Sequence, residues 1–204
     1  MNAGTQRHSI AGPAGLRECA IDDPAGAPPR GVAVLCHPHP LHGGTMDNKV
    51  GQTLARALVQ RGFRAVRFNF RGVGASAGHW DQGHGEVDDV LAVVAHWRDA
   101  ALPLALGGFS FGGAMATRAA ARLPDGAKAT RLVLVAPAVL NFDPAPVPQD
   151  SLVIHGEADE VVPLQAVLDW ARPQVLPVTV VPATGHFFHG QLALLKQLVV
   201  NGWG

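Results

Sequence analysis

The stretch Gly107-Gly108-Phe109-Ser110-Phe111-Gly112-Gly113 follows an apolar run at 102–106 and precedes a helical pattern of small residues. A serine exposed on a sharp turn between a strand and a helix requires glycine two residues before and after it, because side chains there would collide with the strand and the helix. We interpret the stretch as a nucleophile elbow and predict Ser110 as the nucleophile. Alone, the same pattern also suits a glycine-rich loop with a solvated serine, so the rest of the sequence must decide.

Apolar runs of strand length alternate with helical patterns along the chain, which is typical of βαβ units and of a mainly parallel sheet covered on both faces. After an N-terminal strand or hairpin within 7–21, the predicted strands are 31–36, 65–70, 104–109, 131–135, 152–154 and 178–181. The predicted helices, with apolar residues at helical spacing, are 48–61, 86–100, 111–123, 164–171 and 191–201. The pattern indicates an α/β fold, and the length of 204 residues predicts one domain over 1–204.

The balance of charge narrows the classes of partner. The chain has 16 basic and 16 acidic side chains and no run of like charge, so we expect neither a nucleic-acid partner nor an anionic membrane surface, but a small molecule. Residues 1–15 lack the apolar stretch of a secretion signal and no segment reaches the length of a membrane span, which predicts a cytoplasmic protein.

We expect Cys19 and Cys36 to be free thiols. The protein is expected to be a monomer or a homodimer, with Trp203 either in the core or on a dimer surface.

The proline-rich stretch 137–150 is the one linker-like segment, and it lies within the alternation of strands and helices. It is therefore predicted to be a loop and not a domain boundary. A loop of this length has no space for a lid of several helices, so we expect the nucleophile to be open to solvent.

A serine hydroxyl needs a base to take its proton, and the base needs a carboxylate that fixes its tautomer and stabilises its cation. Acidic residues occur in the stretch 155–163, which reads His-Gly-Glu-Ala-Asp-Glu-Val-Val-Pro and follows a predicted strand. Histidines occur in the stretch 183–190, after the last predicted strand. Both stretches are expected at the carboxyl edge of the sheet, where the elbow also lies.

The order Ser110, Asp159, His186 therefore predicts a catalytic triad assembled from three strand ends. Asp159 also suits a carboxylate that caps a turn, and His186 also suits an ordinary loop histidine. The alternatives are Glu157 and Glu160 for the acid and His189 for the base.

Acyl transfer also requires donors for a developing oxyanion. The N–H of Phe111, directly after the nucleophile, is the first predicted donor. The second is expected from the loop 36–44, where Pro38 and Pro40 have no N–H to give, so the amides of His39 and Leu41 are the candidates.

Two groups of polar residues permit another interpretation. Cys36, His37, His39 and His42 could form a metal site, but their spacing lacks the paired ligands of structural zinc sites, and we predict no metal there. The second group is interpreted as a solvated, glycine-punctuated loop, and its members are His79, Asp81, His84 and Glu86.

Four segments carry a specific resemblance: 36–49 (CHPHPLHGGTMDNK), 68–74 (FNFRGVG), the elbow, and 185–190 (GHFFHG). Together they closely resemble the small bacterial serine hydrolases of the α/β-hydrolase superfamily, within it the lid-poor group related to the dienelactone hydrolases. The resemblance implies a minimal α/β-hydrolase fold with no substantial lid and the hydrolysis of carboxylic esters. Dienelactone hydrolases carry cysteine at the elbow where this chain has Ser110, which argues against lactone specificity.

By position, the resemblance assigns the nucleophile to Ser110, the acid to Asp159 and the base to His186, and the turn 39–41 corresponds to the oxyanion loop. Arg71 resembles a position near the mouth of the site, but we interpret it as a loop charge that packs on the sheet edge and leave it out of the site.

These observations predict a serine hydrolase of the carboxylesterase type, which cleaves a small-molecule ester through an acyl-enzyme without a cofactor. The triad is indifferent to the leaving group, so cleavage of thioesters, lactones or peptides remains an alternative. A ligand-binding module that keeps the fold without turnover, and a metal hydrolase using the histidine-rich loop, are further alternatives.

Overall fold

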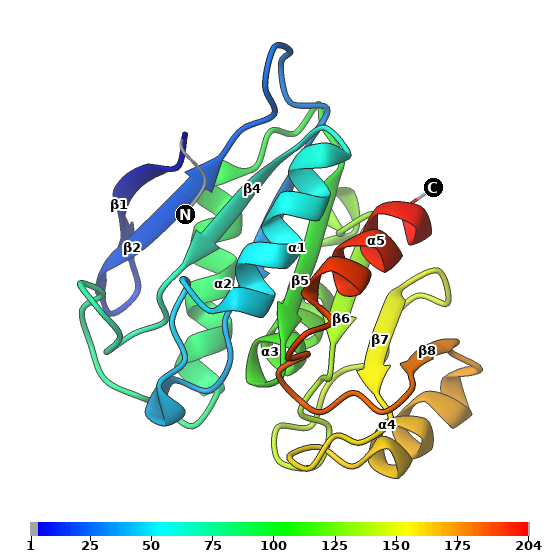
Figure 1. Ribbon diagram of the computed structural model, residues 1–204. Helices are drawn as coiled ribbons and strands as arrows, with labels where there is room; N and C mark the ends of the chain where they lie inside the picture. The colour runs from blue at the N-terminus through cyan, green and yellow to red at the C-terminus, as the bar shows by residue number, and fades with distance from the viewer. Residues whose placement is uncertain (1–3, 204) are drawn as a thin grey trace.

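An eight-stranded sheet forms the centre of the computed structural model, which describes residues 4–203 (Figure 1). Residues 1–3 and 204 lie outside the described residues; they belong to the predicted domain, and 1–3 also belong to the segment 1–15 that is expected to lack a secretion signal. The strands are β1 (Gln6–Gly12), β2 (Gly15–Asp22), β3 (Gly31–Cys36), β4 (Phe63–Phe68), β5 (Leu104–Phe109), β6 (Arg131–Val135), β7 (Leu152–Gly156) and β8 (Val178–Val181). Their order in the sheet is β1-β2-β4-β3-β5-β6-β7-β8.

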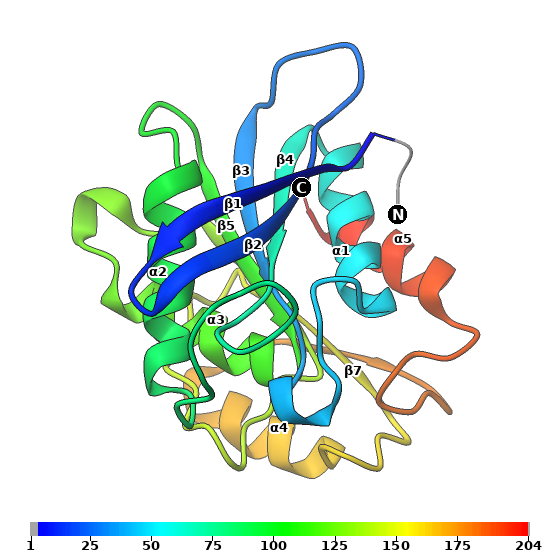
Figure 2. The same cartoon turned by 90° about the vertical axis from the view of Figure 1, so that its left-hand side faces the viewer.

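The hairpin of β1 and β2 occupies one edge of the sheet, nearest the viewer in Figure 2, and β2 runs antiparallel to both β1 and β4. All other neighbouring strands pair in parallel. Because parallel strands end on the same side, the residues that follow β3, β5, β7 and β8 meet at one carboxyl edge. This edge carries the candidate site.

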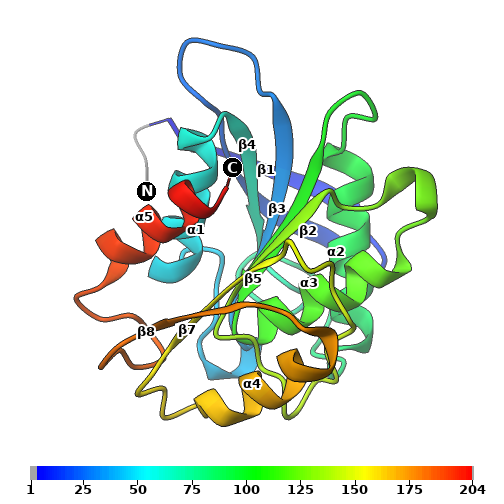
Figure 3. The same ribbon diagram turned by 90° about the vertical axis from the view of Figure 1, so that its right-hand side faces the viewer.

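Helices cover both faces of the sheet. The helices are α1 (Lys49–Gln60), α2 (His84–Trp97), α3 (Phe111–Arg122), α4 (Leu164–Ala171) and α5 (Leu192–Gly202), with short 3-10 helices η1 (Pro40–His42), η2 (Asp125–Ala127) and η3 (Arg172–Gln174). Helices α1 and α5 lie side by side on one face, and α2, α3 and α4 pack on the other (Figures 1 and 3). Along β3, Val32 and Val34 face one core and Ala33 and Leu35 the other, which explains why the strand is apolar throughout.

The predicted α/β-hydrolase fold is confirmed, and the differences lie at element ends. Strand β4 begins and ends two residues earlier than the predicted 65–70. It begins early because Phe63 pairs with Gly31, and it ends early because the Phe70 N–H donates to the His37 ring and not to a strand. Helix α2 ends at Trp97 and not at residue 100, because Arg98 is extended, with φ −63° and ψ 133°. The three 3-10 helices were not predicted.

The connection between β6 and β7 agrees with the predicted absence of a lid. Residues 136–151 are all described and contain no helix. Most of the segment lies on the protein surface, and its hydrogen bonds to the rest of the protein include those from the Ala145 N–H to Thr117 Oγ1 (3.0 Å) and from the Val147 N–H to Gln174 Oε1 (2.8 Å). The carboxyl edge of the sheet is therefore not covered by a helical lid.

Three further expectations can be compared with the structure. Cys19 and Cys36 are buried and free. Trp203 is 4% exposed and contacts the Phe63 ring edge-on and the Arg131 guanidinium, so it belongs to the core and not to a surface patch. Within residues 4–203, no helix has both the length and the apolar character needed to cross a membrane.

Candidate active site

Ser110 stands between the end of β5 and the start of α3, with φ 55° and ψ −120°. Side chains at the flanking glycines are excluded, because a Cβ at Gly108 would overlap the backbone of Gly112 and a Cβ at Gly112 would overlap the carbonyl of Cys36. The backbone of Ser110 is held by its neighbours: its N–H donates to Val135 O at 2.9 Å. The strained turn of the predicted elbow is therefore present, with Ser110 at its tip.

His186 and Asp159 form a buried pair beside this turn. His186 Nδ1 lies 2.7 Å from Asp159 Oδ2, and the two side chains are 3% and 0% exposed. The other carboxylate oxygen of Asp159 accepts the N–H groups of Val161 (2.9 Å) and Val162 (2.8 Å). A carboxylate can only accept, so Nδ1 carries the proton and Nε2 keeps its lone pair for a proton from another group.

The alternative acids and base lie elsewhere. Glu157 accepts the N–H of Ala183 at 2.9 Å on the surface. Glu160 approaches the backbone N–H of His186, at 3.5 Å, and not its ring. His189 is exposed and makes a ring contact with Phe187. Of the three acids, Asp159 alone contacts the His186 ring.

Asp159 is held in its charged form. Burial acts to raise the pKa of this carboxyl, but the hydrogen bonds from His186 and from the Val162 and Val161 N–H groups outweigh burial and hold the pKa below its ordinary value. The carboxylate is therefore ionised at neutral pH, which is the state that orients and stabilises a histidine base.

Ser110 and His186 line the same cavity, of about 230 Å³. Its other lining residues are Pro38, His39, His42, Gly43, Gly44, Asn48, Val161 and Phe187. Among the described residues, the Ser110 side chain makes no hydrogen bond, including none to His186. Catalytic hydrogen bonds are often long in substrate-free sites and tighten when substrate binds. Two exposed apolar side chains, Val161 and Phe187, stand at the rim.

His37 holds the loop after β3, and sequence reasoning missed this function. The Phe70 N–H donates to His37 Nε2 at 3.0 Å, so Nδ1 carries the ring proton and donates to Pro38 O at 2.6 Å. The C=O and N–H of one trans peptide point in opposite directions, so the N–H of His39 points away from the His37 ring. In residues 4–203 nothing accepts that N–H, whereas the Leu41 N–H donates to His39 Nδ1 at 3.2 Å.

His37 is 2% exposed, and burial lowers its pKa to about 4. The unfolded chain therefore takes up a proton at higher pH than the folded protein, and the stability from the neutral ring, complete above the ordinary pKa, is lost as the pH falls toward 4. We expect the free energy of unfolding to fall between pH 7 and pH 4 by about 3 kcal/mol more in the wild type than in His37→Gln, whose amide does not titrate. Urea unfolding at both pH values measures the difference.

The exposed His84→Gln variant is the matched control and should follow the wild type. If His37→Gln lost as much stability as the wild type on acidification, proton uptake at His37 would not be the cause.

A second histidine, His155, supports Asp159 and was also missed. It is 0% exposed in β7, its Nε2 donates to Val162 O at 2.9 Å, and the same nitrogen lies 3.6 Å from Asp159 Oδ2. Burial lowers its pKa, although the charge of Asp159 and the bond to Val162 oppose the change, so the ring is neutral. His155 thus fixes the turn that carries Asp159. The signal available in the sequence was a histidine within a buried parallel strand.

Several of the polar residues that were considered as metal ligands or as part of a solvated loop make contacts that stabilise the fold. No three His, Cys, Asp or Glu side chains in the described part of the chain are arranged to hold a metal ion. The interpretation of Glu86 as part of a solvated loop was wrong: it is buried and accepts the N–H groups of Asp81 and Gly83, which caps the start of α2. Arg71 is held by buried Asp89, with Nη2–Oδ1 at 2.9 Å, and does not line the cavity.

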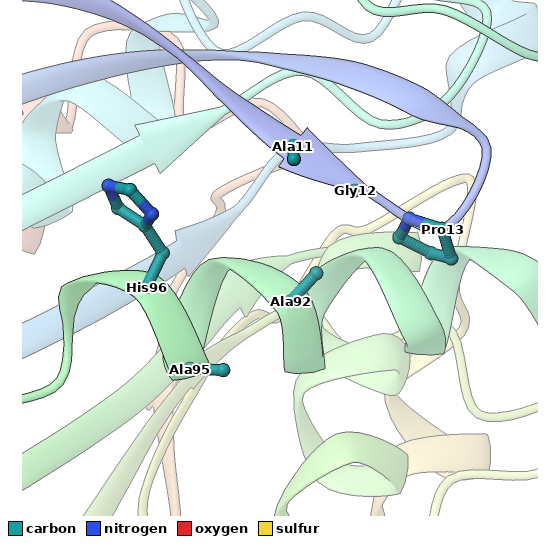
Figure 4. A pocket seen from close by; sticks show the side chains of 6 residues that line it. All are labelled: Ala11, Gly12, Pro13, Ala92, Ala95 and His96. Carbon is teal, nitrogen blue, oxygen red and sulfur yellow. The ribbon is translucent and has the colours of Figure 1, made fainter.

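A larger cavity, of about 460 Å³, lies between the β1–β2 hairpin and α2 (Figure 4). It is lined by Ala11, Gly12, Pro13, Ala92, Ala95 and His96. None of these side chains is a nucleophile, and His96 has no acid beside it among the six, so this cavity lacks the groups for acyl transfer. The smaller cavity at Ser110 is the candidate active site.

Comparison with known proteins agrees with this geometry. Residues 27–151, more than half of the chain, match the family described as serine aminopeptidase, S33. The chain belongs to this family. The hydrolase is 39% identical to a Xanthomonas campestris protein whose crystal structure is described as an α/β serine hydrolase without a lid, with a TM-score of 0.87 over 99% of this chain and 94% of that one. It is also 39% identical to an α/β serine hydrolase homologue from Coxiella burnetii, with a TM-score of 0.85 over 98% of this chain and 97% of that one.

A curated relative, an uncharacterized protein of Rickettsia prowazekii, is 34% identical to the hydrolase over 155 residues. The match covers 71% of this chain and 63% of the relative, so the hydrolase spans less than two thirds of that protein's length. The hydrolase is thus a lid-poor member of the α/β serine hydrolases. The finer resemblance to the dienelactone hydrolases stays a prediction.

Proposed function

We propose that this hydrolase cleaves small carboxylic esters, with Ser110 as nucleophile, His186 as base and Asp159 as the acid that orients it. The observation that carries the proposal is the 2.7 Å pair of Asp159 and His186, placed so that His186 lines one cavity with Ser110. The apolar rim and the lack of a lid suit a small substrate that enters directly from solvent.

Catalysis follows from these positions. His186 Nε2 takes the proton of Ser110, and Oγ attacks the carbonyl carbon of the ester. His186 then gives the proton to the leaving alcohol oxygen, which leaves an acyl group on Ser110. Water, activated by the same histidine, releases the acid and restores the hydroxyl. No step requires a cofactor or a metal ion.

For the oxyanion we propose the N–H groups of Phe111 and His39. The Leu41 N–H is already bonded to the His39 ring, which favours His39 over Leu41 as the second donor. His37 would act here as a positioning residue, because its Nδ1 holds the carbonyl of the peptide whose N–H belongs to His39.

The His37→Phe variant tests this oxyanion loop. Phenylalanine fills a similar volume but cannot hold the Pro38 carbonyl, so one donor is misplaced, and we expect kcat to fall by about 10² to 10³ with a smaller change in KM. His37→Gln, which keeps one donor and one acceptor, should recover part of the loss. Equal kcat in the wild type and His37→Phe, measured on folded protein, would remove His37 and the His39 amide from the mechanism.

The esterase proposal is tested by hydrolysis of p-nitrophenyl acetate, butyrate and octanoate together with fluorophosphonate labelling. We expect turnover of the acetate and a covalent label that mass spectrometry locates on Ser110. Parallel assays with a thioester, a lactone and an aminoacyl p-nitroanilide separate the alternatives, the last because the matched family is described as an aminopeptidase. Absence of both label and turnover would favour a ligand-binding module instead.

A further inference from the structure

A second cavity, of about 150 Å³, adjoins the one that contains Ser110. Its walls come from the start of α1, the loop before α5 and the start of α5, and its lining residues are Asn48, Lys49, Val50, Phe187, His189 and Leu192. Asn48 and Phe187 line both cavities, so the two cavities are direct neighbours. Helices α1 and α5, which frame it, lie side by side on the same face of the sheet (Figure 3).

The walls of this second cavity are held in place by backbone contacts. Phe188 is fully buried with φ 52°, its N–H donates to Gly185 O at 3.1 Å, and its C=O accepts the Gln191 N–H at 2.9 Å. This conformation leaves the neighbouring Phe187 42% exposed, between the two cavities. At the start of α1, Asn48 Oδ1 accepts the N–H of Val50 at 2.9 Å, which fixes this end of the helix. A preformed site binds without the cost of ordering loops.

The lining has an apolar part and a basic part. Val50, Phe187 and Leu192 supply apolar surface, and no acidic residue is among the lining side chains. Lys49 is exposed and forms no ion pair with any described residue. An apolar cavity with an unpaired cation at its wall suits an apolar group that ends in an anion.

The mechanism decides which part of the substrate lies here. His186 must give its proton to the leaving oxygen, so the alcohol part of an ester has to lie next to the His186 ring. The Phe187 ring contacts that ring edge-on, with centroids 5.1 Å apart, and also lines the second cavity. A leaving group that extends past Phe187 enters the second cavity, whereas the acyl group stays beside Ser110 and the oxyanion loop.

We infer that the second cavity binds the alcohol part of the substrate, and that the preferred alcohol is an apolar chain or ring with a carboxylate at its far end. This inference rests on the proposed esterase function. The overall reaction is hydrolysis: water adds across the acyl C–O bond, the acyl group leaves as a carboxylic acid, and the leaving oxygen takes a proton to become a hydroxy acid.

Three acetate esters test the inference: ethyl acetate, hexyl acetate and 6-acetoxyhexanoate. We expect kcat/KM to rise about fourfold for each methylene that enters the cavity, because burial of one methylene contributes about 0.8 kcal/mol. At low salt, kcat/KM should be about fivefold higher for 6-acetoxyhexanoate than for hexyl acetate because of the carboxylate, and this difference should disappear at high salt. Lengthening the acyl group of an ethyl ester should not reproduce either effect.

Two variants of lining residues should remove these gains separately. Leu192→Trp fills the cavity, so within this variant kcat/KM for hexyl acetate should be close to kcat/KM for ethyl acetate. Lys49→Gln should remove only the preference for 6-acetoxyhexanoate over hexyl acetate. Lys128→Gln is the matched control, since Lys128 is exposed, directly follows η2 and lines neither cavity. Lys49 is exposed, so its variant stays informative if Leu192→Trp does not fold.

Binding of 6-hydroxyhexanoate, measured by titration calorimetry or ligand-observed NMR, reports on the cavity without turnover. We expect binding to the wild type and to Lys128→Gln, and weaker binding to Lys49→Gln and Leu192→Trp. A flat profile across the three acetate esters, in an enzyme that hydrolyses p-nitrophenyl acetate, would overturn the inference and leave the esterase function standing. Lack of hydrolysis with intact, variant-sensitive binding would overturn the esterase function and support the cavity as an anion-bearing alcohol site. Binding unaffected by both variants would overturn the inference in either case.

Discussion

Replacing Ser110 by alanine is expected to lower kcat for p-nitrophenyl acetate by about 10⁴- to 10⁶-fold, the range seen when the nucleophile of a triad is removed. Without Oγ no acyl-enzyme forms, and what remains is the contribution of the oxyanion donors and of substrate binding. The same variant should take up no fluorophosphonate. Steady-state assays at saturating ester measure kcat, and intact-protein mass spectrometry measures the covalent label.

The fold should survive this change. Alanine has the same Cβ as serine at the position with φ 55°, and the Ser110 side chain makes no hydrogen bond with a described residue, so we expect an unfolding midpoint close to that of the wild type. Ser9→Ala, on exposed β1 at the far edge of the sheet, is the matched control and should keep full activity and labelling. Turnover that persisted in Ser110→Ala and disappeared with a chelator would transfer the chemistry to the histidine-rich loop.

The features predicted correctly from the sequence are those that depend on short stretches. Strands β3, β5, β6 and β8 were predicted residue for residue. Strands β3, β5 and β6 lie inside the sheet, and a parallel strand buried on both faces is an apolar run bounded by turns. The elbow was predictable for the same reason, since the glycines that its backbone needs are two residues from Ser110. Ser110, Asp159 and His186 each follow a strand, and the topology of the sheet brings those strand ends to one edge.

The features that sequence analysis missed depend on contacts between distant segments. The orientation of the 37–39 loop is set by the N–H of Phe70, thirty-three positions away along the chain, and periodicity carries no information on that contact. The same contact ends β4 early. Glu86 was assigned to solvent because its neighbours are polar, whereas its carboxylate caps α2 from within the protein. The lining that the two cavities share, at Asn48 and Phe187, likewise forms only when α1 and α5 pack together.

Replacing Asp159 by asparagine is expected to lower kcat by about 10⁴-fold, with little change in KM. The carboxylate can only accept, so it holds His186 with the proton on Nδ1 and the lone pair on Nε2, whereas an amide can donate to Nδ1 and stabilise the opposite tautomer. In that tautomer Nε2 carries a proton and cannot take one from Ser110. Kinetics with p-nitrophenyl acetate and the downfield ring N–H resonance of His186 in the wild type and the variant measure the rate and the tautomer.

The two neighbouring acids provide the control that separates orientation from general charge. Glu157→Gln and Glu160→Gln each remove a negative charge within two residues of Asp159. Among the described residues, Glu157 accepts its hydrogen bond from the Ala183 N–H and Glu160 approaches the backbone N–H of His186, and neither bonds the His186 ring. If charge near the site were sufficient, all three variants would lose comparable activity. The 2.7 Å hydrogen bond between Asp159 and His186 fixes the orientation of the ring, which a nearby negative charge alone does not do. We therefore expect kcat of both glutamine variants to stay within about tenfold of the wild type. Activity retained in Asp159→Asn and lost in Glu160→Gln would instead move the orienting role to Glu160.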